Sequence, residues 1–183
     1  MYKEELLSLI EKYETDYLEE KEYINKIVDF INKNGVIFGK ENKDGHITAS
    51  AWVVNKDKSM VLMTHHRKLD KWLQLGGHTE ENESVLEGAF REALEESGLK
   101  SIEFLSEEIF DVDVHCIPAR KAEKEHFHYD IRFMFTADSD EKIQVSEESK
   151  DVKWIKLDEV KSYANSKSIL RMLDKTKKLI ENM

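Results

Sequence analysis

Hydrophobic and polar residues recur along this chain with two different periods, and the period changes near residue 46. Up to about residue 33, apolar side chains return every three or four positions, the spacing of an amphipathic helix. We therefore expect two helices, or one broken helix, over residues 2–33, built on Leu6, Leu7, Ile10, Tyr13, Ile24, Ile27, Val28 and Ile31. The first glycine of the chain, Gly35, follows this segment and predicts a glycine-type end to the helix.

Beyond residue 46 the pattern becomes that of β-strands, in short runs rich in β-branched and aromatic residues. It predicts strands over residues 47–54, 59–65, 72–75, about 102–105, 109–117, 127–136 and 152–156. Helical spacing returns at about residues 84–97 and 166–181. Because helices and strands do not alternate regularly, the expected fold class is α+β rather than a doubly wound parallel sheet.

Two of the predicted strands carry polar faces. In the strand over residues 127–136, alternation predicts a core face made of Phe127, Tyr129, Ile131, Phe133 and Phe135. If this strand pairs with the preceding one through residues 117–125, their other faces form one ledge of His126, His128, Asp130, Arg132, Asp111, Asp113 and His115. We expect the ledge to bind substrate. A solvated sheet face is the alternative, and a second, histidine-containing metal site is a weaker one because no sequence spacing defines its geometry.

The most demanding chemistry lies in residues 77–99. On a helix with 100° per residue, Glu92, Glu95 and Glu96 share an arc of roughly 100°. Carboxylates one helical turn apart repel each other unless a cation joins them, and hard oxygen ligands favour Mg²⁺ or Mn²⁺. A solvated acidic face is the alternative, but it does not explain why Gly77 and Gly98 stand at fixed offsets in a chain with seven glycines.

These residues carry a family resemblance. The stretch has Gly77, Glu83 and then Arg91-Glu92-Ala93-Leu94-Glu95-Glu96-Ser97-Gly98-Leu99, and it resembles the box of the Nudix hydrolases, with Ala93 small for its aliphatic position. The resemblance extends over about residues 45–160. It implies a Nudix-type α/β/α sandwich with a mixed β-sheet. We expect residues 1–40 to form an N-terminal helical extension and residues 41–183 to form the Nudix domain, ending in a C-terminal helix.

The resemblance also implies an activity, the metal-dependent hydrolysis of a phosphoanhydride bond in a nucleoside diphosphate derivative. The metal ligands would be Glu95, Glu96 and the Gly77 carbonyl, with Glu92 as a further ligand or as the base that activates water. Arg91 would pair with Glu83 and orient the carboxylates. Such a metal polarises phosphoryl oxygens and lowers the pKa of bound water, while a carboxylate accepts the proton.

Two other function classes use related domains. Isopentenyl diphosphate isomerases require a cysteine where this chain has Gly76, which removes their catalytic residue. A non-catalytic nucleotide-sensing domain is expected to have lost carboxylates of the box, and here all four are present. The leading prediction is therefore an enzyme that uses Mg²⁺ or Mn²⁺.

Outside the box we expect substrate contacts from residues 64–68 and from the ledge. His65, Arg67 and Lys68 could bind phosphate and offset the carboxylates, although an exposed basic turn is the alternative. Trp72 could stack on a base or serve only in packing. The predicted substrate-binding residues are His65, Arg67, Lys68, Trp72, His126, His128 and Asp130. Either of two acidic residues, Glu147 or Glu148, could lie near the metals. The WLQLGGH segment resembles a bacterial Nudix subgroup of unsettled substrate, with Leu75 replacing the usual proline.

Composition and charge limit the binding partners and the cellular location that we expect for this protein. The 183-residue chain has a formal charge of −10, which argues against broad nucleic-acid or anionic-membrane binding. The lone Cys116 excludes an internal disulfide. With no apolar run near the roughly 20 residues that span a bilayer and no signal peptide, we expect a cytoplasmic protein. Its partner would be a small nucleotide or diphosphate substrate, and the N-terminal helices would pack on the main domain or form a homodimer.

Overall fold

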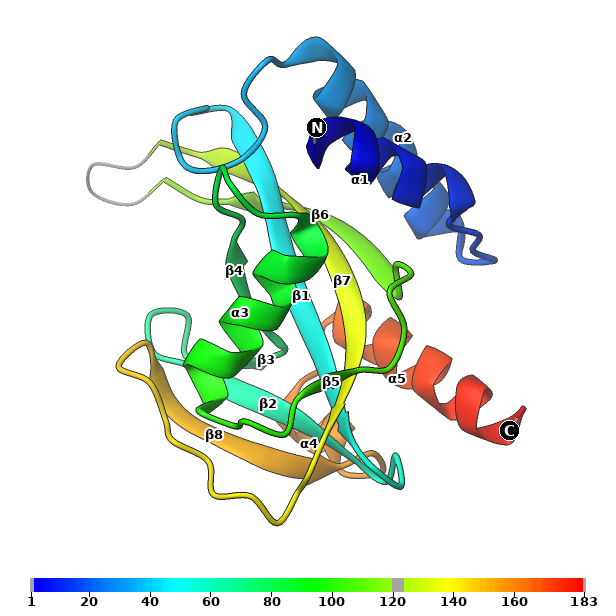
Figure 1. The fold of residues 1–183 in the computed structure, drawn as a ribbon, viewed down its shortest axis with the longest axis vertical. Helices are drawn as coiled ribbons and strands as arrows, with labels where there is room; N and C mark the ends of the chain where they lie inside the picture. Colours follow the sequence, from blue (N-terminus) through cyan, green and yellow to red (C-terminus); the bar gives the residue numbers. More distant parts are fainter. Residues whose placement is uncertain (1, 120–123, 183) are drawn as a thin grey trace.

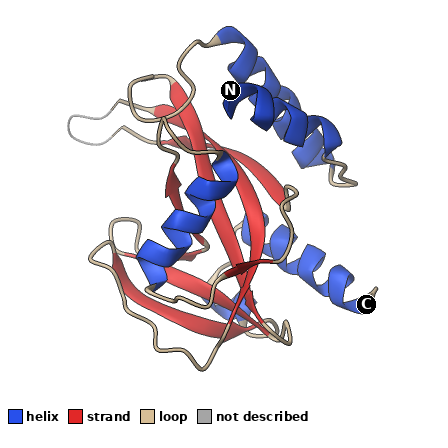
Figure 2. Cartoon of the chain, viewed as in Figure 1, coloured by secondary structure: helices blue, strands red, loops and turns tan. Residues whose placement is uncertain are grey.

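The computed structural model describes residues 2–119 and 124–182. Within them, eight strands form one strongly curved mixed sheet with helices on both sides (Figures 1 and 2). The helices are α1 (Tyr2–Lys12), α2 (Leu18–Lys33), α3 (Val85–Ser97), α4 (Val160–Tyr163) and α5 (Lys167–Glu181). The strands are β1 (Gly45–Asn55), β2 (Met60–His66), β3 (Lys71–Leu73), β4 (Leu75–His78), β5 (Glu103–Phe104), β6 (Asp111–Ile117), β7 (His126–Ala137) and β8 (Ser149–Lys156).

The long strand β1 organises the sheet. It runs parallel to β7 from Gly45↔Phe127 to Asn55↔Ala137, and it pairs antiparallel with β2 and β4. Further antiparallel pairs add β6 and β5 to β7, and β3 and β8 to β2. The predicted pairing of the two polar strands is confirmed, with His115 opposite His128. Part of their connection, residues 120–123, lies outside the described residues.

Two apolar cores, one on each face of the sheet, give the predicted α/β/α sandwich. Alternate residues of β1 divide between the cores because successive strand side chains point to opposite faces. Ile47 and Ala51 pack beneath α1, α2 and α3, whereas Trp52 and Val54 pack with α4 and α5. The α+β class and the predicted arrangement of a mixed sheet between helices are therefore confirmed.

The N-terminal helices share the first of these cores. Leu6 and Ile27 are completely buried in the same cluster as Ile47 of β1. The segment thus packs on the sheet of its own chain. Its separation as a unit of residues 1–40 stays a prediction, and so does a homodimer.

The strand predicted over residues 72–75 is divided in the structure. Strand β3 ends at Leu73 and pairs with β2, whereas β4 begins at Leu75 and pairs with β1. At Gln74 the chain passes from pairing with β2 to pairing with β1. The hydrophobic pattern of residues 72–75 does not predict this change of partner. The change brings Gly76 into close contact with β1, since a Cβ there would lie 2.5 Å from Ser50 Oγ.

Two smaller expectations are corrected. Helix α2 ends on Asn34 rather than on a left-handed glycine, because the Asn34 backbone N–H and side-chain amide both donate to the Phe30 carbonyl. The core face of β7 stops at Tyr129, which stacks on Phe30 with ring centroids 4.2 Å apart. Two residues before it, Phe127 is 43% exposed and so lies outside this core.

Candidate active site

Helix α3 is fixed at both ends before it presents any carboxylate. Ser84 accepts a hydrogen bond from the Glu87 backbone N–H, and the Glu87 side chain accepts one from the Ser84 backbone, so the predicted capping box is present. At the other end Gly98 adopts a left-handed φ of 67°, the glycine stop predicted from the sequence. These local signals hold the carboxylate-bearing turns in one register against β4.

Arg91 connects the acidic residues of this region. Its guanidinium donates to both Glu83 oxygens at 2.7 and 3.0 Å, to Glu92 at 3.0 Å and to Glu95 at 3.2 Å. It also donates to the His78 carbonyl at 3.0 Å. The hydrogen bonds to Glu83 are the main cause of a raised Arg91 pKa. Burial acts to raise the pKa of Glu83, but the Arg91 contact outweighs it and lowers that pKa. Arg91 is therefore placed to orient carboxylates.

Glu96 is buried and Glu92 is partly buried, in surroundings where a free anion is unfavourable. Glu96 is 6% exposed, and burial raises its pKa to about 8, although the Gly76 backbone N–H donates to it at 2.9 Å. Burial also raises the pKa of Glu92, against the opposing effect of Arg91. The charge of Glu148 contributes to both increases, which distinguishes it from Glu147. A cation bound at this position would stabilise the ionised forms of Glu92 and Glu96.

Glu92 can approach strand β4 closely because residue 77 is a glycine. A Cβ on Gly77 would lie 2.6 Å from the Glu92 carboxylate, so only the bare backbone lets the carboxylate approach. Of the predicted ligand set, Gly77 lies on β4 in direct contact with Glu92, and Glu92, Glu95 and Glu96 lie on successive turns of α3. This set offers only oxygen atoms, the donor chemistry of Mg²⁺ and Mn²⁺, and it fits a divalent metal.

A hollow of about 340 Å³ lies beside the histidines. Three of the predicted substrate-binding residues, Lys68, His126 and His128, line it. Its other lining residues did not appear among the predicted site residues: Lys40, Asn42, Lys43, His46, His78, Ile117 and Lys124. His78 follows Gly77 directly and could have been found from that position. No sequence signal connects His46 to the hollow, because it lies near the start of β1, 82 residues before its neighbour in the sheet, His128 (46 and 128).

His65 and Trp72 form a separate surface. Their rings stack with centroids 5.0 Å apart, and His65 Nε2 lies 2.8 Å from an Asp70 oxygen. The Lys153 ammonium lies over the Trp72 ring, 4.7 Å from its centroid. Neither aromatic residue lines the hollow beside the histidines.

The remaining two predicted substrate residues, Arg67 and Asp130, are both engaged in hydrogen bonds within the protein. Arg67 donates to the carbonyls of Glu147 and Ser149 at 2.9 and 2.7 Å and so secures the approach to β8. Asp130 is 2% exposed, and its carboxylate accepts hydrogen bonds from Thr48 and Ser50. These contacts favour structural roles for both residues.

The ledge expected from the sequence is open only over its histidines. Arg132, Asp111 and Asp130 are buried in an ionic cluster that Arg171 of α5 joins through Asp111 at 2.8 Å. The expectation of one continuous open wall was wrong in this part because α5 covers it, which strand alternation alone cannot show.

An acidic cluster of this kind, held by a capped helix against a mixed sheet between helices, is typical of hydrolases that use a divalent metal. The chain belongs to the Nudix family, since the family model described as NUDIX domain matches residues 44–175. It contains a complete Nudix box and is a Nudix pyrophosphohydrolase that cleaves diphosphate bonds of nucleotide derivatives.

Relatives support the same assignment. The chain is 33% identical over 141 residues to a probable DHNTP pyrophosphohydrolase of Lactococcus lactis subsp. cremoris (strain MG1363), covering 75% of this chain and 81% of that protein. A Nudix-family hydrolase from Clostridium perfringens has a similar structure, with a TM-score of 0.55 and 26% identity over 73% of this chain and 97% of that one. The E. coli dihydroneopterin triphosphate pyrophosphohydrolase shares the fold, with a TM-score of 0.57 and 17% identity over 81% and 99% of the two chains.

Among residues 2–119 and 124–182, no helix combines the length and the apolar character needed to cross a membrane.

Proposed function

We propose that this protein hydrolyses a diphosphate bond in a small triphosphate that carries a heterocycle, and that dihydroneopterin triphosphate is the first substrate to test. The observation that carries the proposal is the pair of Glu92, partly buried against Gly77, and Glu96, buried against the Gly76 N–H, whose pKa values are both raised by burial. The 33% identical relative named as a probable DHNTP pyrophosphohydrolase supports the choice of substrate.

The residues of α3 would have different roles in the reaction: metal binding, proton acceptance and positioning. Glu95, Glu96 and the Gly77 carbonyl would hold Mg²⁺ or Mn²⁺, and Glu92 would be a further ligand or the base that accepts the proton of the attacking water. When bound, the metal supplies charge for the phosphoryl oxygens and lowers the pKa of water. Arg91 donates to Glu92 and Glu95 and thereby holds both carboxylates in position.

The residues that choose the substrate would lie outside the helix. Lys68 stands at the hollow beside the histidines and offers an ammonium to phosphate oxygens. The stacked His65 and Trp72 rings present an aromatic surface for a heterocycle. His126 and His128 would contribute ring nitrogens to the wall of the hollow. These roles remain proposals, as does a cytoplasmic location.

A substrate panel tests the proposed function. Dihydroneopterin triphosphate, nucleoside triphosphates, dinucleotides and nucleotide sugars would be incubated with Mg²⁺ or Mn²⁺, and released phosphate, pyrophosphate and nucleoside monophosphate would be measured. We expect metal-dependent release of pyrophosphate from dihydroneopterin triphosphate. Inactivity across the whole panel, with metal shown to be bound, would indicate a sensing domain instead.

Replacement of Glu96 tests the site itself. Glu96→Gln is expected to reduce kcat by about 100- to 10,000-fold, the range for loss of a carboxylate that moves protons or organises water. The variant should keep its circular dichroism spectrum, because glutamine has the same shape without the buried charge. Glu81→Gln, an exposed change just before α3, is the matched control and should retain activity.

A further inference from the structure

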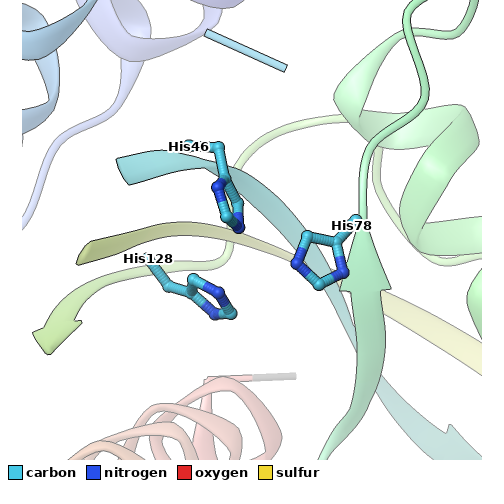
Figure 3. Close-up of side chains that lie close together, drawn as sticks. All are labelled: His46, His78 and His128. Carbon is cyan, nitrogen blue, oxygen red and sulfur yellow. The ribbon is translucent and has the colours of Figure 1, made fainter. Parts of the chain in front are cut away.

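Strand β4 has different chemistry on its two sides. The bare backbone of Gly77 faces Glu92, whereas the next side chain, His78, points to the opposite side, as successive residues of a strand do. There the His78 ring meets the rings of His46 and His128 (Figure 3). The three histidines are therefore separated from the carboxylates of α3 by the strand.

The sheet register explains why three histidines from distant parts of the chain converge. In the parallel pair of β1 and β7, His46 is directly opposite His128. In the antiparallel pair of β1 and β4, His78 is opposite Thr48, two positions from His46 and so on the same face. Three adjacent strands thus each contribute one imidazole to one spot.

The rings meet closely, and three of their buried nitrogen atoms have no hydrogen-bond partner among the described residues. One nitrogen from each ring can be chosen so that all three lie within 4.8 Å of one another. His46 is 3% exposed, yet neither of its ring nitrogens makes a hydrogen bond with any described residue, and the same holds for the buried Nε2 of His128. Buried polar atoms without partners are costly, so this arrangement calls for a ligand that binds imidazole nitrogen.

A transition metal ion is the ligand that such a group fits. Neutral imidazole is a good ligand for Zn²⁺ and its neighbours, with metal–nitrogen distances of about 2.0–2.1 Å, and three histidines leave a fourth position open. Tetrahedral coordination requires nitrogen atoms about 3.3 Å apart, so binding of the metal would draw the three rings toward one another from their present spacing of up to 4.8 Å. Mg²⁺, which prefers oxygen, would not compete for these nitrogens.

We propose that His46, His78 and His128 bind one divalent transition metal ion of the Zn²⁺ class, at a site distinct from the carboxylate cluster. All three ligands line the same hollow, and Lys40, Lys43, Lys68 and Lys124 line it as well. The open coordination position therefore faces a positively charged space and accepts an anionic oxygen, such as that of a phosphate.

Metal titration of the complete protein tests the proposal. We expect isothermal titration with Zn²⁺, in the presence of excess Mg²⁺, to show one tight site per chain. His128→Gln should weaken this site by more than about 100-fold, since even loss of an outer-sphere partner commonly costs about 10- to 100-fold. His65→Gln, a histidine on another surface, is the matched control and should leave Zn²⁺ affinity unchanged. Equal Zn²⁺ affinity in His128→Gln and wild type would overturn the proposal.

A second comparison separates this site from the carboxylates. Glu96→Gln should retain Zn²⁺ binding, whereas His128→Gln should retain Mn²⁺ binding measured by electron paramagnetic resonance. Loss of the tight Zn²⁺ site in Glu96→Gln would instead assign it to the carboxylate cluster. Failure of the proposed hydrolase activity would leave both of these metal titrations interpretable.

Spectroscopy on the wild-type protein tests the histidine site without depending on whether a variant folds. Co²⁺ should give the intense visible bands of a four-coordinate nitrogen site, and Zn²⁺ should shift the ring ¹⁵N signals of three histidines. Inorganic phosphate is expected to change the Co²⁺ spectrum by occupying the open position. Unshifted histidine signals at saturating Zn²⁺ would contradict the triad, and a Co²⁺ spectrum unchanged by phosphate would contradict the open position.

Discussion

Position 77 shows how much of the active site depends on the absence of one side chain. Gly77→Ala would place a Cβ 2.6 Å from the Glu92 carboxylate. We expect the carboxylate to be displaced and kcat to fall by about 100-fold, the effect of a misplacement near 1 Å. Unfolding free energy should decrease by about 1–3 kcal/mol from overpacking. Gly35→Ala is the control, because a Cβ there meets nothing within 4 Å, and it should leave both quantities unchanged.

Glu96 should also give the metal-free protein a distinctive pH dependence. Its pKa is about 8 in the folded protein and near 4.5 in the unfolded chain. The folded state therefore holds the proton more tightly, so stability is greatest below pH 4.5 and is lost as the pH rises toward 8.

Denaturant unfolding in a chelating buffer measures this effect. Between these pH values the unfolding free energy of the wild type should fall relative to Glu96→Gln, by on the order of a few kcal/mol. Divalent metal should reverse the loss by pairing with the ionised carboxylate. A difference between the two proteins that stays constant with pH would contradict the assignment.

At the scale of the element, α3 depends on its capping box. Ser84→Ala removes the acceptor for the Glu87 backbone N–H and should cost about 1 kcal/mol of unfolding free energy. Thermal unfolding provides the measurement, and metal affinity should fall with it because the carboxylates follow the helix. Ser8→Ala, at an exposed position within α1, is the control and should change stability by less than about 0.5 kcal/mol.

Strand β4 is the element that organises both proposed sites. Its backbone provides Gly77 to the carboxylates, and its last residue directs an imidazole to the opposite side. Arg91 contacts the parts of the chain that carry both sites. Its guanidinium donates hydrogen bonds to the His78 carbonyl and to the Glu83 carboxylate. The position of β4 follows from its pairing with β1 rather than with β2.

At the scale of the molecule, buried charges join the N-terminal helices to the catalytic domain. Glu20 of α2 is fully buried, accepts a hydrogen bond from the Val112 backbone N–H at 3.1 Å, and lies 2.6 Å from the Lys175 ammonium. Lys175 also pairs with Asp111 of β6 at 3.0 Å. Helix α2, strand β6 and helix α5 are thus connected by one carboxylate.

Glu20→Ala should therefore destabilise the whole chain. Removing Glu20 leaves the buried Val112 N–H without its acceptor and Lys175 with Asp111 as its remaining carboxylate partner, and loss of one member of a buried charge cluster typically costs about 3–5 kcal/mol. A single cooperative transition at lower denaturant concentration is the expected result. Glu22→Ala, exposed on the same helix, should shift the midpoint little. Equal stability of Glu20→Ala and the wild type would show that this contact does not join the N-terminal helices to the rest of the chain.

The box of residues 77–99 could be predicted nearly completely from the sequence. Its helix start at Ser84, its stop at Gly98 and the common face of its glutamates all follow from interactions within a few residues, and the geometry of an α-helix is the same in every context. Strand alternation likewise predicted the pairing of β6 with β7. Local rules were sufficient wherever the partners lie close together in the chain.

Tertiary structure decided what lies outside the box. Asp130 and His128 alternate on the same face of β7, yet one is enclosed within the ionic cluster and the other lines the hollow, because α5 covers only part of that face. His46 meets His128 only through the register of a parallel strand pair whose partners are 82 residues apart (46 and 128). The sequence by itself determined the carboxylate chemistry, since helix periodicity is local. The convergence of the histidines was decided by the tertiary structure, since strand order, register and helix cover depend on the packing of the whole chain.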